Sequence, residues 1–157
     1  MSLGNKTRAR FAEPVESLLR IKGATVWSIG PDATVYDAIE MMAEKGIGAL
    51  PVVSGGALTG MISERDYTRK IILQGRNSRD TPVSEIMTSP VKSVSPSDSL
   101  DDCMRIMTQE KIRHLPVVAG GELTGMLSIG DVVKWMIQMQ DHTIGQLERY
   151  IAGEYPT

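Results

Sequence analysis

Residues 50–66 read LPVVSGGALTGMISERD, and residues 115–131 read LPVVAGGELTGMLSIGD. Over the first 14 positions only three pairs differ, namely Ser54/Ala119, Ala57/Glu122 and Ile62/Leu127. The shared pattern predicts an apolar strand, a glycine turn and a second strand. A helix is then expected to begin at Ser63 in the first copy and at Ser128 in the second. Two parts of this chain should therefore build the same local structure.

The similarity extends well beyond this stretch. A shift of 65 residues aligns 26–72 with 91–137 without a gap, and 19 of those 47 positions are identical. Each copy opens with a predicted strand, at 26–29 and at 91–94, and an amphipathic helix follows. Each repeat should therefore run strand, helix, strand, strand, helix, which is an α+β arrangement. The final helices are expected over 64–74 and about 129–140.

The ends of the first helix in each repeat carry recognisable signals. Thr34-x-x-Asp37 and Ser99-x-x-Asp102 are the pattern of a capping box, in which a hydroxyl and a carboxylate satisfy free backbone N–H groups. Gly46 stands where a left-handed residue should end the first of these helices, and Lys111 takes that place in the second.

Four segments follow from this pattern. Residues 1–20 hold a tail and a lead-in helix over 11–21, and 141–157 form an amphipathic segment. The two repeats occupy 21–80 and 81–140. A single repeat is too small to bury both faces of its sheet, so the two should pack together about a pseudo-twofold axis. Between them, a polar loop should lead into a short helix that begins at Pro82.

Composition excludes several classes of function. The net charge is −2, which offers no general attraction to nucleic acid or to an anionic membrane. No apolar run approaches the roughly 18 residues of a membrane span, and no signal peptide is visible, so a cytoplasmic protein is expected. Cys103 is the single cysteine, and it should fill a buried helix face rather than act in redox chemistry. His114 and His142 lie far apart, so no metal site is expected.

With its tandem repeats and its two Gly-Met-x-Ser-x-x-Asp junctions, the chain resembles a pair of cystathionine β-synthase (CBS) domains, known as a Bateman module. The resemblance covers about residues 20–138, nearly all of the sequence, so an attached catalytic or transport domain is not expected. It implies two clefts between the repeats that bind adenine nucleotides or adenosyl compounds. It also implies pairing of modules and regulation of another protein.

The resemblance assigns the ribose of a bound nucleotide to the Ser-x-x-Asp pairs, Ser63 with Asp66 and Ser128 with Asp131. A carboxylate accepts two hydrogen bonds in fixed geometry, which suits a cis-diol. Both pairs are also capping boxes, and that interpretation requires no ligand. Adenine would lie against the approach to each first strand, at Lys22, Ala24, Val26, Thr88, Pro90 and Val91. Lys22 departs from the small polar residue usual in the family.

Phosphate requires cations. Arg113 and His114 precede Leu115, and related modules place basic residues there toward the cleft whose ribose is held by the other repeat. They are therefore expected to serve the nucleotide on Asp66, with help from Arg65 or Arg69. Their counterparts Gly48 and Ala49 are uncharged. The cleft at Asp131 should be less cationic, so it could stay empty or take a bulkier or less charged ligand, such as the dinucleotide NAD(H) or an adenosyl compound.

Three functions remain open. The first is a non-catalytic sensor of AMP or another adenine nucleotide that signals to an unidentified protein. The second is an interaction scaffold with vestigial clefts. An enzyme is disfavoured because the sequence has no nucleophile–histidine or metal-ligand set. A homodimer is expected, since both final helices carry apolar residues that a paired module cannot all bury, namely Ile71, Ile72, Met136 and Ile137.

Overall fold

The structure, a computed structural model, describes residues 12–23 and 25–139 of the 157-residue chain. Residue Ala24 and the expected C-terminal segment 141–157 lie outside the described residues. The described residues form two compact units that alternate along the chain. The α2 unit contains 12–23, 96–115 and 127–139, and the β1 unit contains 25–95 and 116–126.

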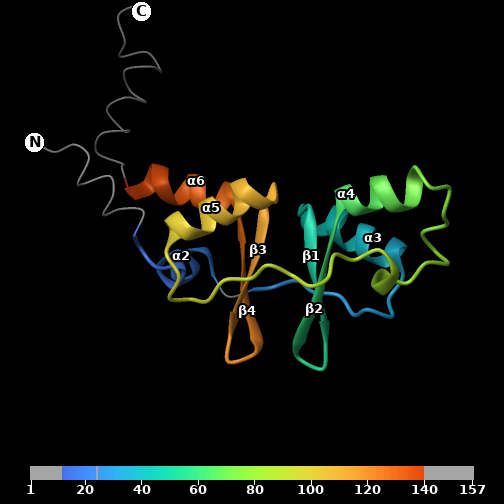
Figure 1. Cartoon of the computed structure of the whole chain (residues 1–157), viewed down its shortest axis with the longest axis horizontal. Coiled ribbons are helices and arrows are strands. Elements are labelled where there is room, and N and C mark those ends of the chain that lie inside the picture. Colours follow the sequence, from blue (N-terminus) through green and yellow to red (C-terminus); the bar gives the residue numbers. More distant parts are fainter. Residues whose placement is uncertain (1–11, 24, 140–157) are drawn as a thin grey trace, which may run out of the picture. The chain divides into compact units, whose positions relative to one another are not determined.

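The β1 unit holds the first repeat together with 81–95 and 116–126 of the second (Figure 1). Its helices and strands are α3 (Val35–Lys45), β1 (Ala49–Ser54), β2 (Ala57–Ser63), α4 (Glu64–Tyr67), the π-helical turn η1 (Thr68–Ile72) and the 3₁₀ turn η2 (Val83–Glu85). Helices α3 and α4 lie beside the β1–β2 hairpin (Figure 1). Their inward faces form one core, made of Ile29, Val35, Ala38, Met42, Leu50, Val52, Ile62, Ile71, Val83 and Ile86. Each large aliphatic side chain buried there contributes about 1.5–3 kcal/mol.

Helices make up most of the α2 unit. They are α2 (Val15–Lys22), α5 (Leu100–Glu110) and α6 (Ile129–Met139), and α6 packs against both of the others. The second hairpin joins β3 (His114–Ala119) to β4 (Glu122–Ser128). Its glycine turn has φ values of 59° and 79° at Gly120 and Gly121, and the first hairpin has 57° and 84° at its own two glycines. Both predicted hairpins are therefore confirmed.

The N-terminus of each first long helix bonds to a short helix from another part of the chain, α3 to η2 and α5 to α2. Val35 N–H donates to the carbonyl of Thr81 at 2.9 Å, and Val83 N–H donates back to Ala33 at 2.8 Å. In the α2 unit, Leu100 N–H donates to Glu13 at 2.9 Å and Val15 N–H to Asp98 at 2.8 Å. Helix α2 thus serves the second repeat as η2 serves the first. This relation explains why the units alternate along the chain.

The predicted opening strands are wrong. Around Ile29 and Val94 the chain makes only single parallel bridges, to Val52 and to Val117. Each bridging residue donates one backbone hydrogen bond and accepts another, at 3.1 and 2.9 Å for Ile29 and at 3.0 and 2.8 Å for Val94. Val26, three residues before the bridge at Ile29, is not part of a strand.

The first of the two final helices also differs from its prediction. The α-helical part of 64–74 lasts only from Glu64 to Tyr67, and a π turn then runs from Thr68 to Ile72. This turn buries Ile71 to 1% exposure, so Ile71 is a core residue and not part of an exposed apolar face. At the first long helices, Thr34 Oγ1 accepts from Asp37 N–H and Ser99 Oγ from Asp102 N–H, each at 3.1 Å. The hydroxyl half of each predicted capping box is thus confirmed.

Candidate functional site

The first Ser-x-x-Asp junction lies where β2 ends and α4 begins. Asp66 Oδ2 accepts hydrogen bonds from the backbone N–H of Ser63 at 2.9 Å and from its hydroxyl at 3.0 Å. In return, Asp66 N–H donates to Ser63 Oγ at 3.2 Å. Glu64 N–H donates to the Gly48 carbonyl at 3.1 Å. The junction is therefore a complete capping box that fixes the Asp66 carboxylate at the end of the strand.

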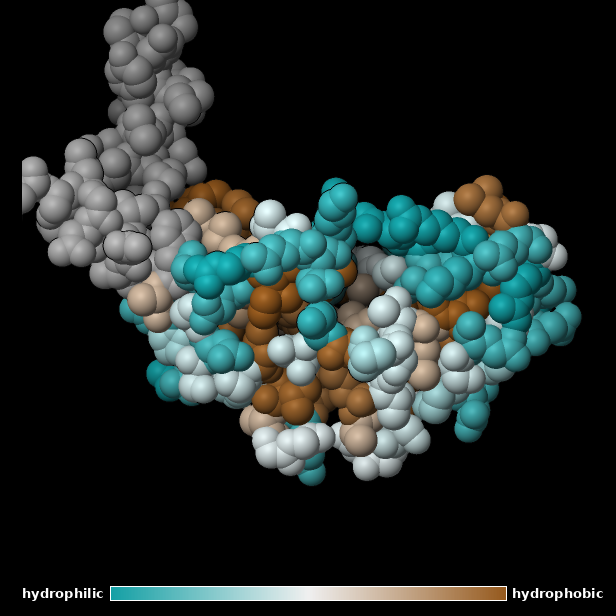
Figure 2. Space-filling view, in the orientation of Figure 1, coloured by the Kyte–Doolittle hydropathy of each residue, from teal (hydrophilic) through white to brown (hydrophobic). Residues whose placement is uncertain are grey.

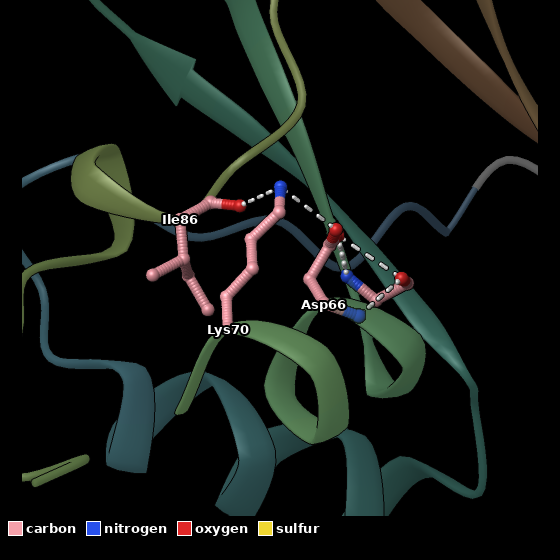
Figure 3. A network of polar contacts seen from close by, with 4 residues as sticks. Asp66, Lys70 and Ile86 are labelled. Atoms are coloured by element: carbon pink, nitrogen blue, oxygen red, sulfur yellow. Dashed lines mark hydrogen bonds and ion pairs between the residues drawn. The ribbon is translucent and has the colours of Figure 1, made fainter. Parts of the chain in front are cut away.

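A lysine that the sequence analysis missed holds this carboxylate. Lys70 Nζ lies 3.2 Å from Asp66 Oδ1 and also donates to the Ile86 carbonyl at 2.8 Å. Figure 3 shows the ammonium between these two acceptors. The i, i+4 spacing of Asp66 and Lys70 is the sequence signal that could have revealed the pair. Arg65 and Arg69, which were the predicted cations of this turn, are exposed.

The second junction repeats the first. Asp131 Oδ2 accepts from Ser128 N–H at 2.9 Å, and Asp131 N–H donates to Ser128 Oγ at 3.0 Å. Ile129 N–H donates to the Arg113 carbonyl at 2.9 Å, just as Glu64 bonds to Gly48 in the first repeat. The capping interpretation therefore holds at both junctions, and two equivalent carboxylates stand at equivalent strand ends.

Lys22 is the cation at the second junction. Its Nζ lies 2.6 Å from Asp131 Oδ2, and the two side chains are 33% and 23% exposed. Burial acts to raise the pKa of Asp131, but the hydrogen bond and charge of Lys22 and the hydrogen bonds from Ser128 outweigh it and leave that pKa lowered. From the sequence, Lys22 is predicted near adenine, and little positive charge is expected at this junction. The structure instead places an ammonium directly on the expected ribose acceptor.

The lysines at the two junctions come from positions that do not correspond in the two repeats. The offset of 65 residues pairs Lys70 with Trp135 and Met87 with Lys22. Lys70 contacts Asp66 from its own helix, and Lys22 contacts Asp131 from α2. Each carboxylate thus has one lysine partner. Neither lysine aligns with a lysine in the other repeat.

The other predicted residues are placed as follows. Thr88 is exposed, and its backbone N–H and carbonyl both bond to Met61, at 2.8 and 3.0 Å, so its amide has a partner within the chain. Val26 and Val91 are partly buried, and Pro90 is exposed and follows a cis peptide bond. Arg113 is exposed and His114 partly buried. No three potential metal ligands gather anywhere in 12–23 or 25–139.

Both repeats match the family model of the CBS domain, over residues 24–73 and 83–138. The chain belongs to the CBS-domain family. It is 44% identical over 138 residues to the mitochondrial CBS domain-containing protein CBSX3 of Arabidopsis thaliana, covering 85% of this chain and 66% of that relative. A solved CBS-domain protein from Burkholderia ambifaria is 50% identical, with a TM-score of 0.77 over 82% of this chain and 96% of its own.

A second solved CBS-domain structure contains a ligand. It is CBSX2 in complex with AMP, which is 28% identical with a TM-score of 0.68, covering 81% of this chain and 98% of that one. The sequence-based identification of a CBS pair and its α+β fold is confirmed by these matches. CBS-domain proteins of this kind are regulatory, and both matched ranges of this chain are CBS domains. Within the described residues, every helix is too short or too polar to cross a membrane.

Proposed function

We propose that this chain is a regulatory module that binds adenine nucleotides at its two Ser-x-x-Asp junctions. The observation that carries the proposal is the paired geometry of Asp66 and Asp131, each fixed at a strand end by its serine. A carboxylate held in this way is preorganised to accept both hydroxyls of a ribose. The AMP complex of the related CBSX2 supports the choice of ligand.

Adenine would lie beside the chain that approaches each single-residue bridge, at Val26 in one repeat and at Thr88, Pro90 and Val91 in the other. Lys22 and Ala24 belong to the same approach by sequence. Because the amide of Thr88 already bonds to Met61, the hydroxyl of Thr88 is the group we expect to contact the base. AMP is the simplest ligand, and NAD(H) is the larger candidate.

For the phosphate of a nucleotide on Asp66, we retain Arg113 and His114, together with Arg65 and Arg69. A charge-assisted hydrogen bond to phosphate contributes roughly 1.5–3 kcal/mol. Arg113→Ala should therefore weaken AMP much more than adenosine, which has no phosphate. An unchanged ratio of the two affinities would assign the phosphate to other cations.

We also propose that the module acts as a homodimer and signals to a partner protein. The described part of α6 exposes three large apolar side chains, Val133, Ile137 and Met139, at 46%, 42% and 43%. Figure 2 shows hydrophobic surface over this helix. Exposed apolar area of this kind usually marks an interface. Sedimentation at tens of micromolar should give a dimer, and a clean monomer would contradict the proposal.

A cytoplasmic location stays a prediction, and we propose no contact with nucleic acid.

Ligand binding is tested by calorimetry and thermal shift with AMP, ADP, ATP, NAD(H) and S-adenosylmethionine on ligand-free protein. A ligand at 100 times its Kd should add about 2.7 kcal/mol of apparent stability. Asp66→Ala and Asp131→Ala should each weaken one site by up to about a hundredfold, because the ribose hydroxyls lose their acceptor. If well-folded protein binds none of these compounds, the interaction scaffold is the better interpretation.

A further inference from the structure

The two ribose-accepting carboxylates are occupied by chemically different groups. At Asp66, Oδ2 accepts from the backbone N–H and from the hydroxyl of Ser63. At Asp131, Oδ2 accepts from the backbone N–H of Ser128 and from the ammonium of Lys22. A carboxylate oxygen has about two acceptor positions, so in each case this oxygen is fully used. A cis-diol that needs both oxygens must displace one donor.

Displacing these donors has different consequences. The Ser63 hydroxyl is neutral and can rotate about its own bond, so moving it leaves no charge without a counterion. Moving Lys22 from Asp131 separates an ion pair that is half-buried, where charges interact more strongly than in water. A neutral nucleoside supplies nothing to replace the carboxylate. A ligand with a phosphate supplies an anion within reach of the flexible lysine side chain.

The anchoring of the two lysines also differs. Lys70 and Asp66 belong to one continuous helical segment, and Lys70 donates in addition to the Ile86 carbonyl. Lys22 is the last residue of α2, and its bond to Asp131 spans 109 positions of sequence. Gly23 follows with φ of 97°, a backbone conformation that only glycine adopts readily. Lys22 therefore stands at the end of its helix, next to the turn in the backbone.

We propose that Lys22 determines the ligand specificity of the Asp131 site, by exchanging its carboxylate partner for the phosphate of a phosphorylated ribose compound. This inference rests on the proposed binding of nucleotides at the two junctions. It adds which ligands the Asp131 junction should prefer. The Asp131 site accepts ribose phosphates and discriminates against neutral nucleosides. This differs from the expectation, based on sequence, of a weakly cationic site for less charged ligands.

The test measures AMP and adenosine affinities by calorimetry in the Asp66→Ala protein, in which the Asp131 site remains. Lys22→Met is the informative second change, since methionine is the residue at the corresponding position of the first repeat, Met87. Adenosine should bind more tightly because no ammonium competes for Asp131, and AMP should bind more weakly because its phosphate loses a cation. Because both effects act in the same direction, the ratio of the adenosine Kd to the AMP Kd should fall about tenfold or more.

Arg20→Met is the matched control. It removes a positive charge from the same helix, but Arg20 is exposed and pairs with Glu16 at 3.7 Å instead of with the site. This change should leave the preference for AMP as it was. If Lys22→Met leaves the preference unchanged, or if Arg20→Met lowers it equally, the assignment of Lys22 is overturned while nucleotide binding stands. If neither ligand binds even to the unmodified chain, both the inference and the proposed function fall.

Discussion

The side chain of Met87 covers Gly60 so closely that a Cβ on Gly60 would lie 2.9 Å from Met87 Cγ. Gly60 belongs to β2, and Met87 directly precedes Thr88, which bridges to Met61 of the same strand. Two backbone hydrogen bonds of that bridge, at 3.0 and 2.8 Å, hold Met87 over the glycine. The space that a side chain at position 60 would take is thus filled by the side chain of Met87.

Gly60→Ala should therefore destabilise the protein. The new methyl group would overlap Met87, and overpacking of this kind costs about 1–3 kcal/mol. Urea denaturation followed by circular dichroism measures the loss. Because the clash is with one side chain, adding Met87→Ala should recover part of the stability that Gly60→Ala removes.

Gly130→Ala is the matched control for this prediction. A Cβ on Gly130 would meet only Ser128 Oγ at 3.7 Å, an ordinary contact, and Gly130 lies in α6. Alanine is favoured over glycine in a helix by about 0.5–1 kcal/mol. We expect Gly130→Ala to be neutral or slightly stabilising. Equal effects of the two substitutions would show that packing against Met87 is not the cause.

The two αL residues that end α3 and α5 give a second matched pair. Gly46 has φ of 63° and Lys111 has φ of 54°. A left-handed conformation costs a non-glycine residue about 1 kcal/mol. Lys111→Gly should therefore stabilise the protein by about that amount, and Gly46→Lys should destabilise it similarly, since nothing lies within 4 Å of a Cβ at Gly46. Chemical denaturation measures both, and changes of the same sign would contradict the prediction.

These left-handed ends, the glycine turns and the capping hydroxyls could all be predicted from the sequence because each depends on residues close together in the chain. Thr34 and Asp37 are three positions apart, and their bond forms whatever the rest of the fold does. Because the sequence is duplicated, the glycine turn and the capping hydroxyl each occur at equivalent positions in both repeats. The duplication also supported the family assignment, which the domain matches confirm.

The wrong predictions and the missed contacts depend on tertiary structure. Whether 26–29 becomes a strand depends on how long the chain stays beside β1, and it makes a single bridge at Ile29. The ion pair of Lys22 and Asp131 joins residues 109 positions apart, and no local pattern indicates it. Of the two lysine contacts at the Ser-x-x-Asp junctions, the pair of Lys70 and Asp66 has the i, i+4 spacing that a local pattern can indicate.

Cys103 should be chemically inert in the folded protein. Its side chain is fully buried, and burial, together with the nearby charges of Asp98 and Asp102, raises the pKa of the thiol to about 12. The thiolate is the reactive form, so almost none is present at pH 8. An aromatic disulfide reagent should release no colour from native protein and one equivalent in denaturant, because the chain has a single cysteine. Rapid reaction of native protein would contradict the burial of Cys103.

The last prediction concerns pH and follows from the lowered pKa of Asp131. Although burial acts to raise this pKa, the interactions with Lys22 and Ser128 outweigh burial, so the folded state binds the proton less tightly than the unfolded state. Such a group contributes its full stability above the unfolded pKa of aspartate, about 3.9, and loses it as the pH falls through the lower folded value. Denaturation midpoints should therefore decline as the pH falls below about 5. In Lys22→Met this decline should be shallower, because the hydrogen bond and positive charge that lower the pKa are gone, whereas Arg20→Met should keep the slope of the unmodified chain. If the pH dependence of Lys22→Met matches that of the unmodified chain, the ion pair makes no contribution to stability in solution.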